Sequence, residues 1–294
     1  MPTPAPTGAV LVTGCSSGIG RATALRLVRG GHQVHATARR PDTLAGLAAA
    51  GCTTGALDVT DDASAAAAVE DARRHHGRVR ALVNNAGYGE YGPVEEVSLD
   101  AARAQLETNV IGVARLTRLV LPEMREAGDG RIVTVGSMGG RLTFPGGGWY
   151  HASKHALVAL HDALRVEVAP FGVHVSLVEP GLIRTEFGAT ATRSLAAAGD
   201  GTGRSEPAAG TDERTPSPYA GLTAAVERGM SRSYAGPLAA GPDAVARAVE
   251  RAVTAERPRS RYVVTPGARG LMALRRLGGD RVWDGFVRRL FGLP

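Results

Sequence analysis

The chain has 294 residues, of which 44% are hydrophobic and 4% aromatic, and its formal net charge is +6. No apolar run approaches the roughly 20 residues that a membrane span needs, and two cysteines are too few for a disulfide framework. Residues 257–294 hold nine arginines and two aspartates, whereas the preceding part holds 25 basic and 26 acidic residues. These features exclude a transmembrane protein and give no reason to expect a nucleic-acid or membrane partner. Because no signal sequence precedes the first apolar run, we expect a reduced, cytoplasmic protein.

Strand and helix patterns alternate along the first 180 residues. A β-branched run at 9–13 is followed by glycines and then by apolar residues at helical spacing. Further strands are predicted at 32–38, 53–59, 79–85, 130–137 and 173–181, and helices at 41–51, 61–77, 99–128 and 150–172. Right-handed crossovers between such strands predict an α/β fold, a doubly wound parallel sheet of the Rossmann type in a single domain.

The alternation fails after Pro180. Residues 188–218 are rich in Gly, Pro, Ser, Thr and Ala, and a loop of this length is usually a lid or disordered. We therefore expect a flexible substrate loop within about 186–240, a helix near 242–255 and a strand at 261–265. The domain would span residues 8–265, and an amphipathic helical extension would follow at 266–294.

The stretch TGCSSGIG, residues 13–20, lies between the first predicted strand and the first predicted helix. Backbone N–H groups at a helix N-terminus can cradle a pyrophosphate, and glycines allow the close approach. The spacing is G-x-x-x-G-x-G and departs from the commoner G-x-G-x-x-G, so a plain glycine-rich turn is the alternative.

The end of the second predicted strand indicates which nucleotide the turn would hold. An acid at this position accepts the ribose hydroxyls of NAD, but this chain has Ala38, Arg39 and Arg40 there. Two guanidinium groups suit a 2′-phosphate, which favours NADP. The alternative is that both arginines are solvated helix-start residues in an arginine-biased chain.

Lys154 is the only lysine among 34 basic residues, and it follows Tyr150 by one helical turn. A tyrosine with an ordinary pKa of about 10 is a poor acid–base catalyst at neutral pH unless a cation stabilises its phenolate. A compact ammonium on a flexible stem can supply that charge and also reach ribose hydroxyls. A planar guanidinium has a different hydrogen-bonding geometry. Ser137 ends the fifth predicted strand, at the sheet edge where ligands bind, and could hold a substrate carbonyl.

These motifs, with LDV around Asp58, NNAG at 84–87, TNV around Asn109 and PGLIRT at 180–185, resemble in order and spacing those of short-chain dehydrogenases/reductases. The resemblance covers about residues 8–265. It implies that Tyr150 is the general acid in reduction, that Ser137 polarises the carbonyl oxygen, and that Lys154 lowers the pKa of Tyr150 and holds the nicotinamide ribose. Asn109 would anchor a water of the proton relay.

The resemblance also implies a cofactor site for NADP(H). Ser17 stands where NADP-preferring relatives often have a basic residue, so Arg39 would carry more of the discrimination. The residues expected to bind the cofactor are Gly14, Ser16, Ser17, Gly18, Ile19, Gly20, Arg39, Arg40, Asp58, Val59, Asn84, Ala86, Gly87, Tyr150, Lys154, Pro180, Gly181, Ile183 and Thr185.

The expected function is NADP(H)-dependent hydride transfer to or from a carbonyl or secondary alcohol, as in a ketoreductase. A mobile lid that must be ordered over the substrate favours a bulky apolar ketone, which can supply the contacts that offset that cost. The alternatives are a non-catalytic, redox-sensing NADP-binding regulator and an epimerase of the related extended family. A homo-dimer or homo-tetramer is expected from the resemblance.

Two features remain outside this scheme. His151 and His155 are one turn apart but lack the Glu of H-E-x-x-H and an evident third ligand, so no metal is expected. The amphipathic segment around Trp283 and Phe286 would cover the substrate cleft, pack in a dimer or lie on an anionic membrane, ranked in that order.

Overall fold

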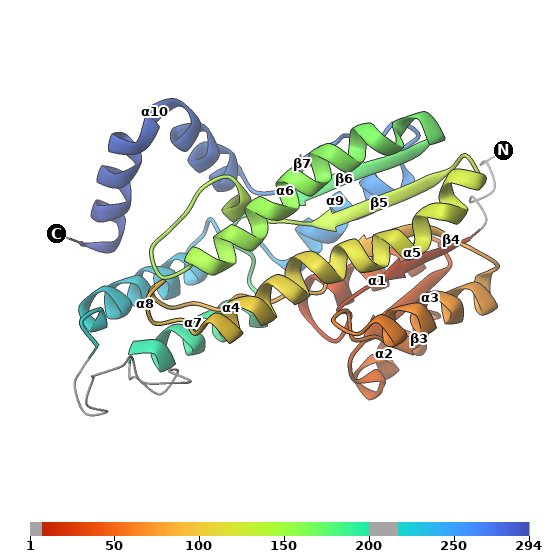
Figure 1. Ribbon diagram of the computed structural model, residues 1–294, viewed down its shortest axis with the longest axis horizontal. Coiled ribbons are helices and arrows are strands. Elements are labelled where there is room, and N and C mark those ends of the chain that lie inside the picture. Colours follow the sequence, from red (N-terminus) through yellow and green to blue (C-terminus); the bar gives the residue numbers. More distant parts are fainter. Residues whose placement is uncertain (1–7, 200–216, 294) are drawn as a thin grey trace.

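The computed structural model describes residues 8–199 and 217–293 (Figure 1). One sheet holds seven parallel strands in the order β3-β2-β1-β4-β5-β6-β7. The strands are β1 Ala9–Val12, β2 Val34–Ala38, β3 Thr53–Ala56, β4 Val79–Asn84, β5 Gly130–Val135, β6 Val173–Glu179 and β7 Arg261–Val263. The strand order reverses between β1 and β4, so the predicted doubly wound, Rossmann-type α/β fold is confirmed.

Helices follow nearly every strand. They are α1 Gly18–Arg29, α2 Ala45–Ala48, α3 Asp62–His76, α4 Leu99–Leu106, α5 Gly112–Glu126, α6 Gly148–Val168, α7 Glu186–Gly199, α8 Ala220–Ala235, α9 Pro242–Thr254 and α10 Pro266–Phe291. Short turns of helix are η1 Pro41–Leu44, η2 Glu107–Ile111, η3 Met138–Gly140 and η4 Ala169–Phe171; η2 is a π-helix and the other three are 3₁₀-helices.

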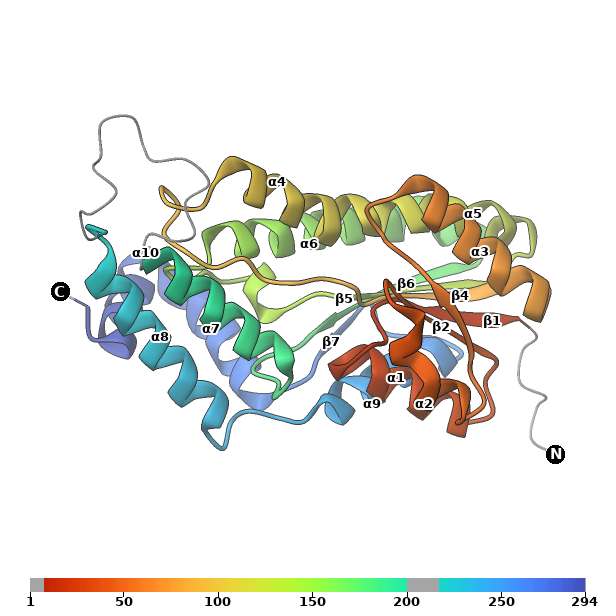
Figure 2. The same cartoon turned by 90° about the horizontal axis from the view of Figure 1, so that it is seen from below.

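Both faces of the sheet are covered. Figure 2 shows α3, α5 and α6 on one face and α1, α2 and α9 on the other. Every residue of β1, sequence AVLV, is buried, because side chains pointing to either face meet a helix layer. In α9, Val245, Val249 and Val253 recur every four residues and are fully buried in the cluster that packs α9 against α1 and the sheet.

A third group of helices lies beyond the carboxyl ends of the strands, where α7, α8 and α10 gather (Figures 1 and 2). Their apolar side chains, including the buried Leu195, Val226 and Trp283, form a separate cluster with Tyr150 of α6. Helix α10 begins after Thr265, whose hydroxyl accepts the amide of Ala268, and it is kinked at Gly279. No helix of the described residues is long and apolar enough to cross a membrane.

The expected loop after Thr185 is largely helical, which corrects the sequence interpretation. Helix α7 covers residues 186–199 and α8 covers 220–235, while residues 200–216 of the expected loop lie outside the described part. Phe187, Ala191 and Leu195 recur every four residues, and Ala191 and Leu195 are fully buried. This apolar spacing outweighs the local Gly, Ser and Thr content because α8 provides a surface for it.

Candidate active site

A cavity of about 1340 Å³ opens at the carboxyl edge of the sheet. The ends of β1, β2, β4, β5 and β6 form one side, and α7, α8 and α10 form the other. In open parallel sheets this crevice is where ligands bind. One end of the cavity is built from the glycine turn, and the other is lined by aromatic and aliphatic side chains.

The glycine turn has the backbone that a phosphate cradle needs. Gly14 and Gly18 have φ values of +70° and +55°, which side-chain-bearing residues rarely adopt. A Cβ on Gly20 would lie 2.2 Å from the carbonyl oxygen of Gly14, so the turn closes tightly onto α1. The cavity is lined here by Gly14, Ser16, Ser17, Gly18 and Ile19, at the N-terminus of α1. This arrangement fits a pyrophosphate.

Asn85, and not the predicted Asn84, lines the cavity after β4. The side-chain nitrogen Nδ2 of Asn85 donates to the carbonyl oxygens of Thr13 at 2.8 Å and Gly14 at 3.1 Å, which fixes the glycine turn to β4. Asn84 is 3% exposed, and its Nδ2 lies 3.5 Å from Thr117 Oγ1 in the core. Because side chains alternate along a strand, the two asparagines point to opposite faces. Ala86 and Gly87 line the cavity as expected.

Arg39, Asp58 and Val59, which follow β2 and β3, line the cavity beside the glycine turn. The hydroxyl and amide of Thr60 donate to Asp58 Oδ1 at 2.7 and 2.9 Å, which lowers the pKa of that carboxyl. Arg39 is exposed at the cavity rim, whereas Arg40 is exposed outside the lining and precedes η1. Of the two arginines, Arg39 is therefore the one that lines the cavity.

Ser137, Tyr150 and Lys154 converge at the centre of the cavity. Ser137 follows β5, and its hydroxyl accepts the amide of Gly139 at 3.0 Å. Tyr150 lies one turn before Lys154 on α6; burial raises the pKa of its phenol, and a hydrogen bond with the Ser137 side chain opposes that rise. The Lys154 ammonium donates to the Val135 carbonyl at 3.2 Å and lies 5.9 Å from the Tyr150 ring centroid. Burial lowers the pKa of Lys154 to about 8.

Asn109 lies next to this centre without lining the cavity. Its side-chain amide donates to the Tyr88 carbonyl at 2.9 Å and to Ser153 Oγ at 3.0 Å, and its oxygen accepts the Tyr88 amide at 3.1 Å. A Cβ on Gly87 would lie 2.9 Å from that oxygen. Asn109 is in the π-helical turn η2, an irregularity that often marks functional sites. Its side chain therefore fixes the loop that follows β4.

Residues 180–185 close the cavity from the end of β6. Pro180, Gly181, Ile183 and Thr185 all line it. A Cβ on Gly18 would lie 3.4 Å from the Thr185 side chain, so this segment packs directly on the glycine turn. The residues of this segment that were predicted to bind the cofactor therefore line the same cavity as the glycine turn.

His151 supports the segment that carries Ser137, a role not evident from sequence. Its Nδ1 contacts the Gly139 carbonyl at 3.0 Å, and its Nε2 accepts the Phe144 amide at 3.1 Å. The Phe144 amide can only donate, so Nδ1 carries the ring proton. Burial lowers the pKa of His151 to about 4, which keeps the ring neutral and preserves both contacts.

Aromatic side chains form the other end of the cavity, and sequence reasoning missed Tyr91 and Phe187 among them. Tyr91 stacks on Tyr150 with ring centroids 5.4 Å apart, and Phe187 lies 5.3 Å from Tyr150. Trp283 lies outside the cavity lining but donates from its indole to the Thr143 carbonyl at 3.1 Å, which docks α10 over this end. The apolar lining comprises Tyr91, Phe144, Phe187, Val226, Met230, Leu238, Leu271, Phe286, Leu290 and Phe291.

Comparisons with known proteins agree with this geometry. Residues 8–195 match the family described as short chain dehydrogenase. The chain is 35% identical over 276 residues to the uncharacterized oxidoreductase YbbO of Escherichia coli K12, covering 94% of this chain and 92% of that protein. It is 44% identical over 190 residues to human 17-beta-hydroxysteroid dehydrogenase type 1, covering 60% of this chain and 57% of that one.

A solved short-chain dehydrogenase from Streptomyces avermitilis superposes with a TM-score of 0.76 at 34% identity, covering 96% of this chain and 98% of the other. Fold, site and relatives together define an oxidoreductase of the nicotinamide-dependent class. The chain belongs to the short-chain dehydrogenase/reductase family, which confirms the resemblance in its motifs.

Proposed function

We propose that this protein is an NADP(H)-dependent oxidoreductase that interconverts a bulky apolar ketone and its secondary alcohol. The observation that carries the proposal is the position of Ser137, Tyr150 and Lys154 between the two ends of one cavity. A dinucleotide that lies on the glycine turn reaches these residues from one side, and an apolar compound reaches them from the other. Hydride transfer needs both partners in contact at that point.

The residues present fit a nicotinamide dinucleotide. The cradle at Gly14 and Gly18 leaves backbone N–H groups of α1 free to face a pyrophosphate, and Asp58 and Arg39 flank the nucleoside end. When bound, the cofactor supplies or accepts the hydride. Solved relatives contain NAD in one case and NADPH in another, at 28% and 29% identity. Arg39, with Ala38 in place of an acid, supports NADP(H) here.

In the reductive direction, the Tyr150 hydroxyl donates its proton to the carbonyl oxygen as that oxygen gains negative charge. The Ser137 hydroxyl donates a hydrogen bond to the same oxygen, so two donors stabilise the charge that develops. Tyr150 is then a phenolate, and the Lys154 ammonium stabilises it and holds the ribose hydroxyls. We assign to Asn109 the anchoring of the water that returns a proton to this pair.

The size of the proposed substrate follows from the apolar end of the cavity. Side chains from α7, α8 and α10 surround it, and their contacts favour a ligand with extended apolar surface. A small aldehyde would contact few of them. The names of two relatives agree with this choice, since one is a 17-beta-hydroxysteroid dehydrogenase and another an actinorhodin polyketide ketoreductase.

A screen of NADPH oxidation tests the proposal with ketosteroids, polyketide-like ketones, quinones and small aldehydes. We expect turnover with bulky ketones, and Tyr150→Phe should abolish it while leaving the NADPH dissociation constant nearly unchanged. NADPH binding without turnover of any carbonyl compound would instead favour the redox-sensing regulator. Activity of Tyr150→Phe within tenfold of the wild type would refute the role of the phenol.

A further inference from the structure

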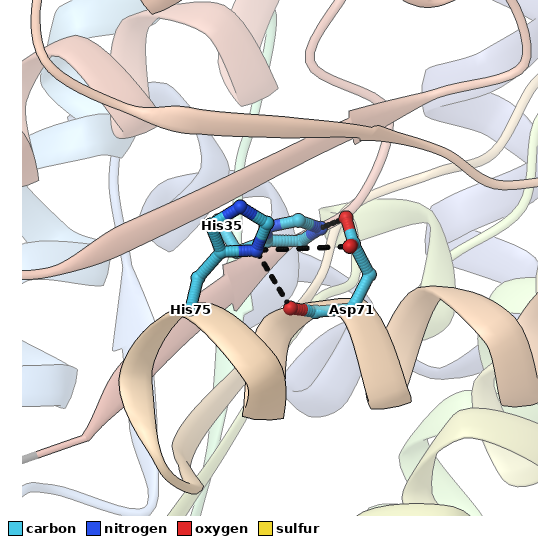
Figure 3. A group of neighbouring side chains, drawn as sticks. All are labelled: His35, Asp71 and His75. Atoms are coloured by element: carbon cyan, nitrogen blue, oxygen red, sulfur yellow. Dashed lines mark hydrogen bonds and ion pairs between the residues drawn. The ribbon is translucent and has the colours of Figure 1, made fainter.

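Three titratable side chains outside the cavity point toward one another between β2 and α3 (Figure 3). They are His35 in β2 and Asp71 and His75 in α3, and one ligand atom of each lies within 4.8 Å of the others. His35 Nε2 lies 3.5 Å from Asp71 Oδ2, and His75 Nδ1 lies 3.6 Å from Asp71 Oδ1. His35 is fully buried, whereas the His75 side chain is 47% exposed.

The hydrogen bonds of Thr53 indicate where the proton of His35 lies. Thr53 Oγ1 contacts the Val34 carbonyl at 3.3 Å, His35 Nδ1 at 2.9 Å and His76 Nε2 at 2.8 Å. A hydroxyl donates once and accepts twice, so donation to the carbonyl requires an N–H from each histidine. When the hydroxyl donates to the carbonyl in this way, His35 carries its proton on Nδ1, and its Nε2 is a lone pair.

That lone pair faces a carboxylate. Within the described residues His35 Nε2 makes no hydrogen bond, although it is completely buried. A lone pair and a carboxylate oxygen at this distance repel each other unless a cation lies between them.

Gly55 leaves room for such a cation. It lies in the middle of β3, where glycine weakens a strand and often marks a close approach. A Cβ at this position would lie 2.8 Å from His35 Nε2 and 3.3 Å from Asp71 Oδ2. Any other residue would therefore place an atom against the gap between the two ligand atoms.

We propose that His35, Asp71 and His75 bind one divalent transition metal ion, with zinc as the best match. Two imidazoles and a carboxylate are a common zinc ligand set, and water completes the coordination in sites with three protein ligands. Ligand atoms of a tetrahedral zinc site lie about 3.4 Å apart. Here His35 Nε2 is 3.5 Å from Asp71 Oδ2, His75 Nδ1 is 3.6 Å from the other carboxylate oxygen, and one ligand atom of each residue lies within 4.8 Å of the others. The Thr53 hydroxyl accepts the other ring proton of His35 and fixes its orientation, as outer partners of metal ligands do.

The neighbouring charges are compatible with this assignment. Arg74 donates to Asp71 Oδ1 at 2.6 Å, which leaves Oδ2 to face His35. His75 Nδ1 contacts the Asp71 carbonyl at 2.9 Å, and this half-exposed ring exchanges that contact for the metal. His76 is occupied by Thr53. The ion would join α3 to β2 near the start of the strand, away from the hydride-transfer site at its carboxyl edge, and so stabilise the fold.

The test is a Co²⁺ titration of the full-length, tag-free protein after chelator treatment, followed by visible absorbance and calorimetry. We expect one Co²⁺ per chain, displaced by Zn²⁺, and a rise in the unfolding temperature with either ion. His75→Ala changes an exposed side chain and should weaken binding at least tenfold. Gly55→Ala should weaken it similarly, because its methyl group enters the gap.

His155→Ala is the matched control, since it removes an exposed histidine that also has a histidine one turn away. It should bind Co²⁺ like the wild type. Absence of Co²⁺ binding by the wild type would overturn the proposal, and so would a His75→Ala variant with unchanged affinity. None of these measurements uses catalytic activity, so their outcome is independent of the proposed reaction.

Discussion

Replacing Lys154 by methionine should make the protein more stable and much less active. Burial lowers the pKa of the lysine from 10.5 to about 8, so the folded state holds its proton less tightly than the unfolded chain. At 1.36 kcal/mol per pKa unit, this shift opposes folding by about 3 kcal/mol below pH 8. The lost hydrogen bond to the Val135 carbonyl offsets about 1 kcal/mol. The net gain at pH 7 is then about 2 kcal/mol.

The sign of the pH dependence follows from the same shift. Because the folded-state pKa is the lower one, the cost is fully present below about pH 8 and is relieved as pH rises toward 10.5. The advantage of Lys154→Met should therefore shrink between these values in urea unfolding measurements. Lys154→Arg keeps the charge, and it should show no such gain. A methionine variant that is no more stable at pH 7, or whose advantage is independent of pH, would refute the reasoning.

Activity should change in the opposite direction. The ammonium lies 5.9 Å from the Tyr150 ring centroid, and at an effective dielectric constant of about 20 this distance corresponds to about 3 kcal/mol between unit charges. Losing it raises the phenol pKa by about two units and lowers the phenolate fraction about a hundredfold. Alcohol oxidation at saturating NADP⁺, followed by NADPH absorbance against pH, measures this change. Rates within threefold of the wild type would show that the ammonium does not stabilise the phenolate.

Three further predictions concern the cofactor preference, the support of Ser137 by His151, and the size of the substrate. Ala38→Asp with Arg39→Leu should shift the ratio of NADPH to NADH dissociation constants toward NADH at least tenfold, since a charge-assisted contact contributes about 1.5–3 kcal/mol; equal constants in the wild type would contradict this. His151→Ala should lower kcat about tenfold with NADPH affinity unchanged, because Ser137 loses its support; an unaltered kcat would assign His151 to packing alone. Trp283→Ala should raise KM for a bulky ketone at least tenfold but leave KM for a small aldehyde unchanged; parallel changes for both compounds would exclude α10 from substrate binding.

Much of the fold and the centre of the site could be predicted because local patterns determine them. Alternating strands and helices permit few topologies, and residues that directly follow parallel strands meet at one edge. Ser137 after β5 and the turn after β1 were placed correctly for this reason. The spacing of Tyr150 and Lys154 fixes their common direction on a helix.

The parts of the fold and of the site that could not be predicted depend on contacts between segments distant in sequence. The two asparagines at 84 and 85 are equivalent in sequence, and the end of β4 decides which one points to the glycine turn. Helix α7 was missed because its packing partner, α8, lies beyond a segment rich in Gly and Pro. The group formed by His35, Asp71 and His75 joins a strand to a later helix, so their sequence positions give no metal-binding spacing.

The C-terminal helix shows how one amphipathic segment can be assigned among rival destinations. Sequence gave three possible locations for its apolar face, with the substrate cleft ranked first. In the structure Trp283 and Phe291 are 4% and 8% exposed, and Phe286, Leu290 and Phe291 line the cavity. The buried aromatic residues of this helix are thus packed against α8 and the segment after Ser137, whereas Val282 on the same helix is 50% exposed. Binding to a bilayer through those buried aromatic side chains would have to undock α10 and open the cavity, so this mode of membrane attachment and retention of a bulky substrate would compete for the same side chains.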